Sequence, residues 1–287
     1  MRGVLVVDVG NTTTKLGLFD ADAGWAAARA PAGAPSKAAA PLNEPVGTLS
    51  ITTHTRYTAD EARMAIVQAL GIWNAPTPVG AVLASVVPAL SDVWHTALAT
   101  ASTGRVMVVG PGLKSGIRMR YDDPAEVGAD RVADIVAARS DYGAPVVVVD
   151  LGTTTNFEVV DADGAFVGGI IAPGLALGAH SLASAAARLP EVELRAPERV
   201  IGRNTRAAMQ SGVVLGEVAR IDGLLAAIME ELGVAGTGAA GADGAPSVVV
   251  TGTRAAWLAG LLHHETIADN TLTLRGLYYL WCRNTRK

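Results

Sequence analysis

Apolar residues in this chain occur in short runs that glycine and small polar residues interrupt. Residues 3–19 predict a strand, a turn and a second strand, because the apolar runs GVLVV and KLGLF flank the polar sequence DVGNTTT. Another strand, turn and strand begins at Val146. Further β-type runs occur at 80–88, 106–110 and 247–253, the last of which enters a glycine turn.

Helical periodicity appears between these strands. Thr58 begins a predicted helix that reaches Leu70, since its hydroxyl can cap the helix and Glu61 lies three residues on, as in a capping box. An apolar stripe predicts a helix over residues 127–140. Other helical regions are expected at 175–187, at 205–232 and after 253.

Two segments of the chain repeat each other. VVDVGNTTT at 6–14 matches VVDLGTTTN at 148–156, at an offset of 142 residues. Asp8 falls on Asp150 in this alignment, and the glycine two residues later is matched as well. A chance similarity of two valine-rich strands is the alternative, and the shared Asp-x-Gly-x-Thr-Thr argues against it.

The repeat implies two similar domains, each opening with the same hairpin. We expect the first at residues 1–118 and the second at 119–287, both α/β with mixed sheets, and a cleft between them. Residues 22–47 are rich in Ala, Pro and Gly and predict a loop, and 235–246 predict a low-complexity linker.

The turns of the two hairpins carry the strongest chemical signal. Glycine lets the backbone approach a phosphate, whose oxygens exposed N–H groups and threonine hydroxyls can bind. Asp8 and Asp150 end their strands, where a carboxylate can hold a cation or a metal-bound water. With a third turn at 251–253 against the nucleoside, two such turns would grip a nucleoside triphosphate, as in the actin and sugar-kinase phosphotransferase fold. For either aspartate alone, an ordinary turn residue is the alternative.

Composition narrows the function further. The 287 residues are 50% hydrophobic and 5% aromatic, which suits α/β domains with real cores. A net charge of -4 argues against a general nucleic-acid binder, which needs a basic face for phosphates. The single cysteine, Cys282, allows no disulfide within one chain and fits a reducing cytoplasm. Neither a signal peptide nor an apolar run of about 20 residues is visible, so no membrane association is expected.

Other candidate motifs receive ordinary interpretations. No Walker A sequence occurs, and the G-x-G-x-x-G at 236–241 lies in glycine–alanine linker with no strand before it. His263 and His264 are adjacent and lack zinc-ligand spacing to a partner, so we expect a solvated helix end. Cys282 is expected to be a packing residue.

Seven segments, in order, resemble the signature of type III pantothenate kinases. They are DVGNTTTK (8–15), DPAEVGADR (123–131), VVDLGTTT (148–155), GGIIAPG (168–174), IGRNT (201–205), MQSG (209–212) and LTLRGL (272–277). The similarity covers nearly the whole chain, and GADR is its most specific element. The resemblance implies a homodimer with two ribonuclease-H-like domains per subunit. It also implies phosphorylation of pantothenate at the start of coenzyme A synthesis, with ATP, a divalent metal such as Mg²⁺ and a monovalent cation, K⁺ or NH₄⁺.

The resemblance implies roles for single residues. ATP would be bound by Asp8, Val9, Gly10, Asn11, Thr12, Thr13, Thr14 and Lys15 of the first phosphate loop and by Thr153 of the second. Pantothenate would be contacted by Tyr121, Gly128, Ala129, Asp130, Arg131 and Thr205. Asp130 would be the catalytic base, since a carboxylate near a primary hydroxyl can accept its proton as the phosphoryl group arrives. The alternative is an acid in the first turn of a helix, where negative charge is favourable.

Asp150 would be a ligand of the monovalent cation according to the same resemblance. The alternative is that Asp150 only closes a strand or coordinates magnesium-bound water.

The chain departs from the family pattern at two places. The family commonly shows Gly-Thr-Ala-Thr-Thr and an aspartate two positions on, whereas residues 152–156 read GTTTN and Glu158 follows. Its Thr-Gly-Gly at the adenosine end is replaced by TGT, and we expect the side chain of Thr253 to crowd a close backbone approach to the nucleoside. These departures motivate one alternative, a catalytically weak or regulatory relative that binds a ligand or a partner protein. The retained aspartates oppose it. A kinase of another small hydroxylated substrate is the second alternative.

Overall fold

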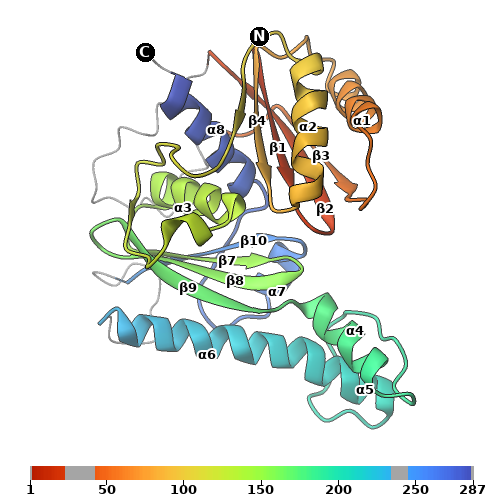
Figure 1. Cartoon of the computed structure of the whole chain (residues 1–287). Coiled ribbons are helices and arrows are strands. Elements are labelled where there is room, and N and C mark those ends of the chain that lie inside the picture. Colours follow the sequence, from red (N-terminus) through yellow and green to blue (C-terminus); the bar gives the residue numbers. More distant parts are fainter. Residues whose placement is uncertain (1, 23–42, 234–244, 286–287) are drawn as a thin grey trace. The chain divides into compact units, whose positions relative to one another are not determined.

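The computed structural model describes residues 2–22, 43–233 and 245–285. Their contacts form two compact units (Figure 1), of which the first comprises Met1–Gly143, Gly164–Phe166 and Thr271–Lys287 and the second Ala144–Asp163 and Val167–Asn270. The predicted domain boundary between residues 118 and 119 stays a prediction. Most of the predicted loop at 22–47, most of the linker at 235–246 and the glycine pattern at 236–241 lie outside the described residues.

A mixed sheet of five strands forms the centre of the first unit. The strands are β1 (Gly3–Val9), β2 (Thr13–Asp20), β3 (Gly47–Thr52), β4 (Gly80–Ser85) and β5 (Val106–Val108), in the order β3-β2-β1-β4-β5. β2 is antiparallel to both β1 and β3, whereas β4 runs parallel to β1 and β5 runs parallel to β4. This order, with these directions, is the ribonuclease-H-like arrangement.

Helices cover both faces of this sheet (Figure 1). The helices are α1 (Ala59–Ile72) and α2 (Pro88–Ala101) on one face, and α3 (Ala129–Tyr142) and α8 (Leu272–Thr285) on the other. Because side chains alternate along a strand, Leu5, Val7 and Val9 join the core under α1 and α2. Val6 points to the opposite face, where it lies close to Gly17 beneath Leu274 of α8.

Helix α8 is held to the N-terminal hairpin and to α3. The rings of Phe19 and Tyr278 stack with centroids 4.7 Å apart, and the Tyr278 hydroxyl donates to the Asp20 carbonyl at 2.8 Å. A Cβ added at Gly276 would lie 1.9 Å from the carbonyl oxygen of Ala133. Glycine is therefore required at this close approach of α8 to α3.

A buried ion pair joins the same two helices. Arg275 Nε donates to Asp141 Oδ2 at 2.8 Å, and the two side chains are 0% and 2% exposed. The Tyr279 hydroxyl donates to the other carboxylate oxygen of Asp141 at 2.7 Å. Burial, together with the charge of Asp141, raises the pKa of Tyr279 far above its usual value, so the phenol stays protonated as the donor.

The second sheet is also mixed. Its strands are β7 (Val146–Leu151), β8 (Thr154–Val160), β9 (Ala165–Pro173), β10 (Ser247–Gly252) and β11 (Ile267–Ala268). β8 is antiparallel to β7, whereas β10 runs parallel to β7 and β11 runs parallel to β10. The short strand β6 (Arg118–Met119) pairs with the first residues of β9, which gives the order β11-β10-β7-β8-β9-β6. The α/β class with mixed sheets is confirmed.

The helices of the second unit are α4 (Leu175–Ala185), α5 (Thr205–Gln210), α6 (Gly216–Glu231) and α7 (Ala255–Ala259). A single π-helical turn, Ser211–Leu215, joins α5 to α6. Val147 and Val149 of β7 share a core with Ile221 and Leu225 of α6. Within the described ranges, no helix has the length and the apolar character needed to cross a membrane.

The structure bears out several local predictions. The Thr58 side chain accepts from the Glu61 N–H at 3.2 Å and the Glu61 carboxylate accepts from the Thr58 N–H at 2.8 Å, so the predicted capping box is present. The helix expected at 205–232 is found, interrupted by the π-helical turn. Cys282 is buried within α8, as expected of a packing residue.

The expectation of a helix end at the paired histidines was wrong. His263 and His264 lie in a turn after α7. His263 Nδ1 lies 2.7 Å from Asp222 Oδ2, and His264 Nδ1 lies 2.9 Å from Asp222 Oδ1. Their backbone N–H groups donate to the same carboxylate, so one side chain on α6 holds the whole turn.

Candidate functional site

The first hairpin turn carries most of the residues expected to bind ATP. Asp8 pairs directly with Lys15 across β1 and β2, so their side chains share one face of the sheet. The Gly10 N–H donates to the Thr13 carbonyl at 3.1 Å and closes the turn. The two residues between them, Asn11 and Thr12, are exposed and present the tip of the loop to solvent.

Two residues of this predicted loop point into the core instead. Val9 and Thr14 are paired with each other and are 0% and 1% exposed. The Thr14 hydroxyl lies 2.8 Å from that of Thr53, just beyond β3. Their side chains therefore fix the loop, and a phosphate would meet the backbone at these positions.

The second hairpin turn is one residue shorter than the first. Asp150 pairs with Asn156, whereas the gapless repeat would pair it with Phe157. The Gly152 N–H donates to the Thr154 carbonyl at 2.9 Å. The shift places Phe157 in the core beneath α6 and Asn156 beside Asp150.

Three oxygen-bearing side chains lie side by side on one face of the second sheet. Asp150 on β7 is paired with Asn156 on β8 and with Thr251 on β10. Asn156 and Thr251 are 9% and 0% exposed, and within the described residues Asn156 Oδ1 and Thr251 Oγ1 have no hydrogen-bond partner. Buried oxygens without a donor suit a hard cation. Among all residues that the structure describes, no group of three or more His, Cys, Asp or Glu side chains could hold a metal ion.

The third turn packs directly against Asp150. Gly252 has φ +92°, and a Cβ there would lie 2.5 Å from Asp150 Oδ1. The Thr253 N–H donates to the Leu151 carbonyl at 2.8 Å. The second phosphate loop and the predicted nucleoside loop are thus neighbours within one unit.

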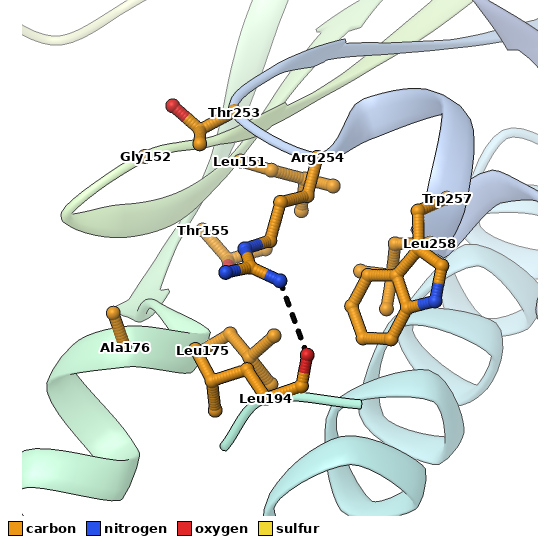
Figure 2. Close-up of a pocket in the computed structure, with 10 residues that line it drawn as sticks. All are labelled: Leu151, Gly152, Thr155, Leu175, Ala176, Leu194, Thr253, Arg254, Trp257 and Leu258. Atoms are coloured by element: carbon orange, nitrogen blue, oxygen red, sulfur yellow. Dashed lines mark hydrogen bonds between the residues drawn. The ribbon is translucent and has the colours of Figure 1, made fainter. Parts of the chain in front are cut away.

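Figure 2 shows the pocket that these two turns line together with the start of α4 and with α7. About 400 Å³ of empty space lies among these residues, part of it open to solvent. Arg254 extends across it to the Leu194 carbonyl, to which Nη1 donates at 3.1 Å, and its guanidinium lies 5.8 Å from the ring of Trp257. The Thr253 side chain points away from Arg254 in this view, and both residues line the pocket.

The GADR segment opens helix α3 in the first unit. Gly128 is the N-cap, Ala129 is the first helical residue and Asp130 lies in the first turn. Asp130 is half-buried, and its Oδ1 accepts from the Arg131 N–H at 2.8 Å. The positive end of the helix dipole favours negative charge here, which suits both interpretations of Asp130.

Phe166 joins two of the residues expected to contact pantothenate. Tyr121 stacks on its ring with centroids 5.6 Å apart, and the Arg131 guanidinium lies 5.8 Å from the same ring. Arg131 is 7% exposed, so its orientation is fixed by this packing. Sequence reasoning missed Phe166, because one more apolar residue at the start of a strand carries no signal.

Thr205 begins α5, where Asn204 is the N-cap and accepts from the Ala207 N–H at 2.9 Å. It belongs to the second unit, whereas Tyr121 and residues 128–131 belong to the first. Their meeting at one substrate stays a prediction. The shared cleft expected for the two phosphate loops stays one as well.

An ion pair on α6, formed by the buried Glu217 and the half-buried Arg220, supports the second hairpin. Glu217 is 5% exposed and accepts from the Thr155 hydroxyl at 2.6 Å. Arg220 binds Glu217 and also donates to the carbonyl oxygen of Pro173. Sequence reasoning missed this pair, although a signal existed: Glu217 occupies the apolar stripe that Ile221 continues on the same helix.

Comparison with known proteins extends these observations to the whole chain. Residues 4–227 match the family model described as Type III pantothenate kinase. The Type III pantothenate kinase of Anaeromyxobacter sp. (strain K) is 38% identical over 283 residues, which cover 98% of this chain and 99% of that protein. That of Brevibacillus brevis is 34% identical over 287 residues, with 98% and 99% covered.

Solved structures show the same fold. A putative Baf family transcriptional activator from Campylobacter jejuni aligns with a TM-score of 0.54 at 19% identity, covering 98% of both chains. The ethanolamine utilization protein EutJ from Carboxydothermus hydrogenoformans aligns with a TM-score of 0.50 at 14% identity, covering 99% of this chain and 90% of that one. At these identities the likeness concerns the fold alone.

Proposed function

The chain belongs to the type III pantothenate kinase family, and we propose that it transfers the γ-phosphoryl group of ATP to the primary hydroxyl of pantothenate. The product would be 4'-phosphopantothenate, at the first step of coenzyme A synthesis. The observation that carries this proposal is similarity along nearly the full length of both chains to relatives named for the activity.

Asp130 is proposed as the base that accepts the hydroxyl proton. Its Oδ1 is engaged by the Arg131 N–H at the start of α3, which holds the carboxylate in place and leaves Oδ2 to face a substrate. A base held in this way needs no rearrangement as the hydroxyl attacks, and general-base catalysis depends on such positioning.

Pantothenate is proposed to lie against the segment that Phe166 organises. Tyr121 and Arg131 pack on that ring, so an aromatic face and a guanidinium are presented together. A guanidinium is suited to the pantothenate carboxylate, to which it can donate two parallel hydrogen bonds. Backbone groups of Gly128 and Ala129, and Thr205 from the second unit, complete the proposed contacts.

ATP is proposed to be held by the turns of both hairpins. In the first loop, which runs from Asp8 to Lys15, the exposed tip offers N–H groups and hydroxyls, and Lys15 offers a positive charge. In the second loop, Thr153 would contact the phosphates. The pocket beside it would take the adenosine, with Arg254 and Trp257 as its walls.

Cations complete the proposed site. Asp150, with the buried oxygens of Asn156 and Thr251 beside it, is proposed to hold K⁺ or NH₄⁺. A divalent metal such as Mg²⁺, when bound with ATP, would offset the phosphate charge.

We propose a homodimer in the cytoplasm. The second unit exposes several large apolar side chains. They are Ile171, Leu177, Leu182, Val200 and Ile201, which are 62%, 40%, 42%, 73% and 82% exposed. A subunit interface that covers them would remove this apolar surface from water. A single buried cysteine fits a reducing compartment.

The test is a coupled assay of ADP formation by the purified chain with ATP, Mg²⁺ and pantothenate, in potassium and in sodium, with mass spectrometry of the product. We expect phosphopantothenate and ADP in equal amounts. ADP formed only with another hydroxylated compound would point to a kinase of a different substrate. ATP binding without turnover on any acceptor would point to the regulatory alternative.

A further inference from the structure

Two side chains of α6 connect the second hairpin to the end of β9. The Thr155 hydroxyl donates to Glu217 Oε1 at 2.6 Å, and Glu217 Oε2 accepts from Arg220 Nη2. The same Nη2 donates to the carbonyl oxygen of Pro173, the last residue of β9. One ion pair on α6 therefore ties the end of the turn at 152–155 to the strand end that precedes α4.

Gly174 closes these contacts into a ring around the turn. Its N–H donates to the Thr153 carbonyl at 3.0 Å. A Cβ at Gly174 would lie 2.5 Å from the Gly152 oxygen and 2.6 Å from the Thr153 oxygen, so the backbones touch and leave no room for a side chain. The turn is thus held on both sides, by Gly174 on one and by Thr155 and Glu217 on the other.

Packing alone does not explain Glu217. Its neighbours Val218 and Ile221 on the buried face of α6 are apolar and lie in the core. The Glu217 side chain is 4% exposed although its partner Arg220 is 32% exposed, and burying a carboxylate among apolar residues costs hydration free energy. An ion pair kept on such a face is better explained by the groups that it holds, which here are Thr155 and Pro173.

The direction in which this pair points is set by the packing of α6. Val218, Ile221 and Leu225 of the same helix lie in the core, and Glu217 is one turn before Ile221. The π-helical turn Ser211–Leu215 ends two residues before Glu217 and joins α6 to α5.

We propose that Glu217 and Arg220 are positioning residues for the phosphates of ATP. They fix the turn at 152–155, so that its backbone donors are oriented before the nucleotide arrives. Donors that are already fixed lose little conformational freedom on binding. Glu217 and Arg220 would therefore lower the Kd for ATP without contacting ATP themselves. The inference rests on the proposed function in taking this turn as a phosphate loop.

The test measures ATP binding directly, by calorimetry on the full chain with Mg²⁺, apart from any turnover. Glu217→Gln keeps the shape of the side chain and removes the charge that holds Arg220. We expect the Kd for ATP to rise roughly 10- to 100-fold, the range for losing a hydrogen bond to a charged group. Amide hydrogen exchange of residues 152–155 and of Gly174 should become faster. Arg220→Lys, at a more exposed position, should act in the same direction and serves if Glu217→Gln does not fold.

Matched variants separate positioning from stability. Thr155→Ser keeps the hydroxyl that Glu217 accepts from and should bind ATP more tightly than Thr155→Val, which lacks that hydroxyl. Leu225→Ala lies on the same helix and in the same core, and should lower the melting temperature while leaving the Kd unchanged.

Two results have separate consequences. Glu217→Gln and Arg220→Lys with wild-type Kd and unchanged exchange would overturn the positioning role. A different result is that the wild type binds ATP more tightly than both variants but does not phosphorylate pantothenate. This result would overturn the proposed function and support the positioning role of Glu217 and Arg220.

Discussion

Lys15 lies directly opposite Asp8 across the first hairpin, on the same face of the sheet. In the second hairpin the corresponding place opposite Asp150 is taken by Asn156. Two loops that repeat each other in sequence thus present different chemistry, a cation beside a carboxylate in one and a neutral amide beside a carboxylate in the other. The pair Asp8 and Lys15 is suited to phosphate oxygens, and the pair Asp150 and Asn156, next to the second phosphate loop, is suited to a bound cation.

Lys15→Met should therefore weaken ATP binding. It keeps the aliphatic stem and removes the charge, and we expect KM for ATP to rise roughly 10- to 100-fold, as for the loss of a charged contact. Lys114→Met is the matched control, since Lys114 is exposed in a loop and should leave KM unchanged. Equal KM values for both variants would remove Lys15 from the site.

Asp130→Asn should abolish most turnover while the protein stays folded. The amide has the same shape and cannot accept the hydroxyl proton, so kcat should fall by roughly 10²- to 10⁴-fold. Steady-state kinetics check this, with the exposed Asp92→Asn on α2 as control. Near-normal kcat in Asp130→Asn would leave only the helix-end interpretation.

Asp150 should make the activity depend on the monovalent cation. Replacing sodium by potassium or ammonium at constant ionic strength should raise the wild-type rate, because these ions are weakly hydrated and suit the oxygens around Asp150. Asp150→Ala should be weakly active and insensitive to the exchange. Full activation of that variant by potassium would show that the ion binds elsewhere.

The ion pair between Arg275 and Asp141 should matter for stability. Arg275→Met removes the positive charge that Asp141, 2% exposed, is paired with, and we expect a loss of about 3–5 kcal/mol in the free energy of unfolding. Arg2→Met is the control, because the Arg2–Asp22 pair is exposed and such pairs contribute about 0–1 kcal/mol. Urea unfolding of both variants measures the difference, and equal losses would contradict this prediction.

The turn held by Asp222 should respond to acid. Burial raises the pKa of Asp222, but hydrogen bonds from His264 and His263 outweigh it and hold the pKa below its usual value. The unfolded chain therefore binds this proton more readily, so the stabilisation is complete above the unfolded pKa of about 3.9 and is lost as the pH falls through the folded value. Asp222→Asn should melt lower than the wild type at neutral pH and approach it in acid. A difference in melting temperature that stays constant down to about pH 2 would contradict the linkage.

Elements whose local signals agree with the tertiary structure were predicted well. The hairpin strands at 3–19 and after Val146 combine β-branched residues with a glycine turn, and both occur as expected. Thr58 and Glu61 satisfy each other within one helical turn, so no distant part of the chain was needed to place the start of α1.

Helix α8 shows why other elements escaped prediction. Every residue from Leu272 to Leu280 is buried, because the sheet and α3 enclose the helix. A helix that is covered all round has no alternation of apolar and polar faces to detect. Helix α2 and strand β3 were missed as well.

The register of the second hairpin and the direction of the Arg254 side chain could not be predicted from the sequence repeat, because both depend on tertiary contacts. The one-residue difference between the hairpins is hidden by a gapless alignment, because the turn sequences match letter for letter through several positions. It decides that Asn156 lies beside Asp150 and that Phe157 points into the core. The path of Arg254 across the pocket likewise depends on Leu194 and Trp257, which the sequence does not mark as its neighbours.

The place of α8 in the first unit sets an order of events on the ribosome. Residues 144–270 are translated before α8, so the second unit can begin to fold while the first still lacks its covering helix. During that interval Phe19, and the sheet face on which Tyr278 will later stack, have no cover from α8. Nascent chains that stall near residue 270 should therefore be bound by chaperones that recognise apolar surface, and released once Leu274 and Tyr278 have emerged.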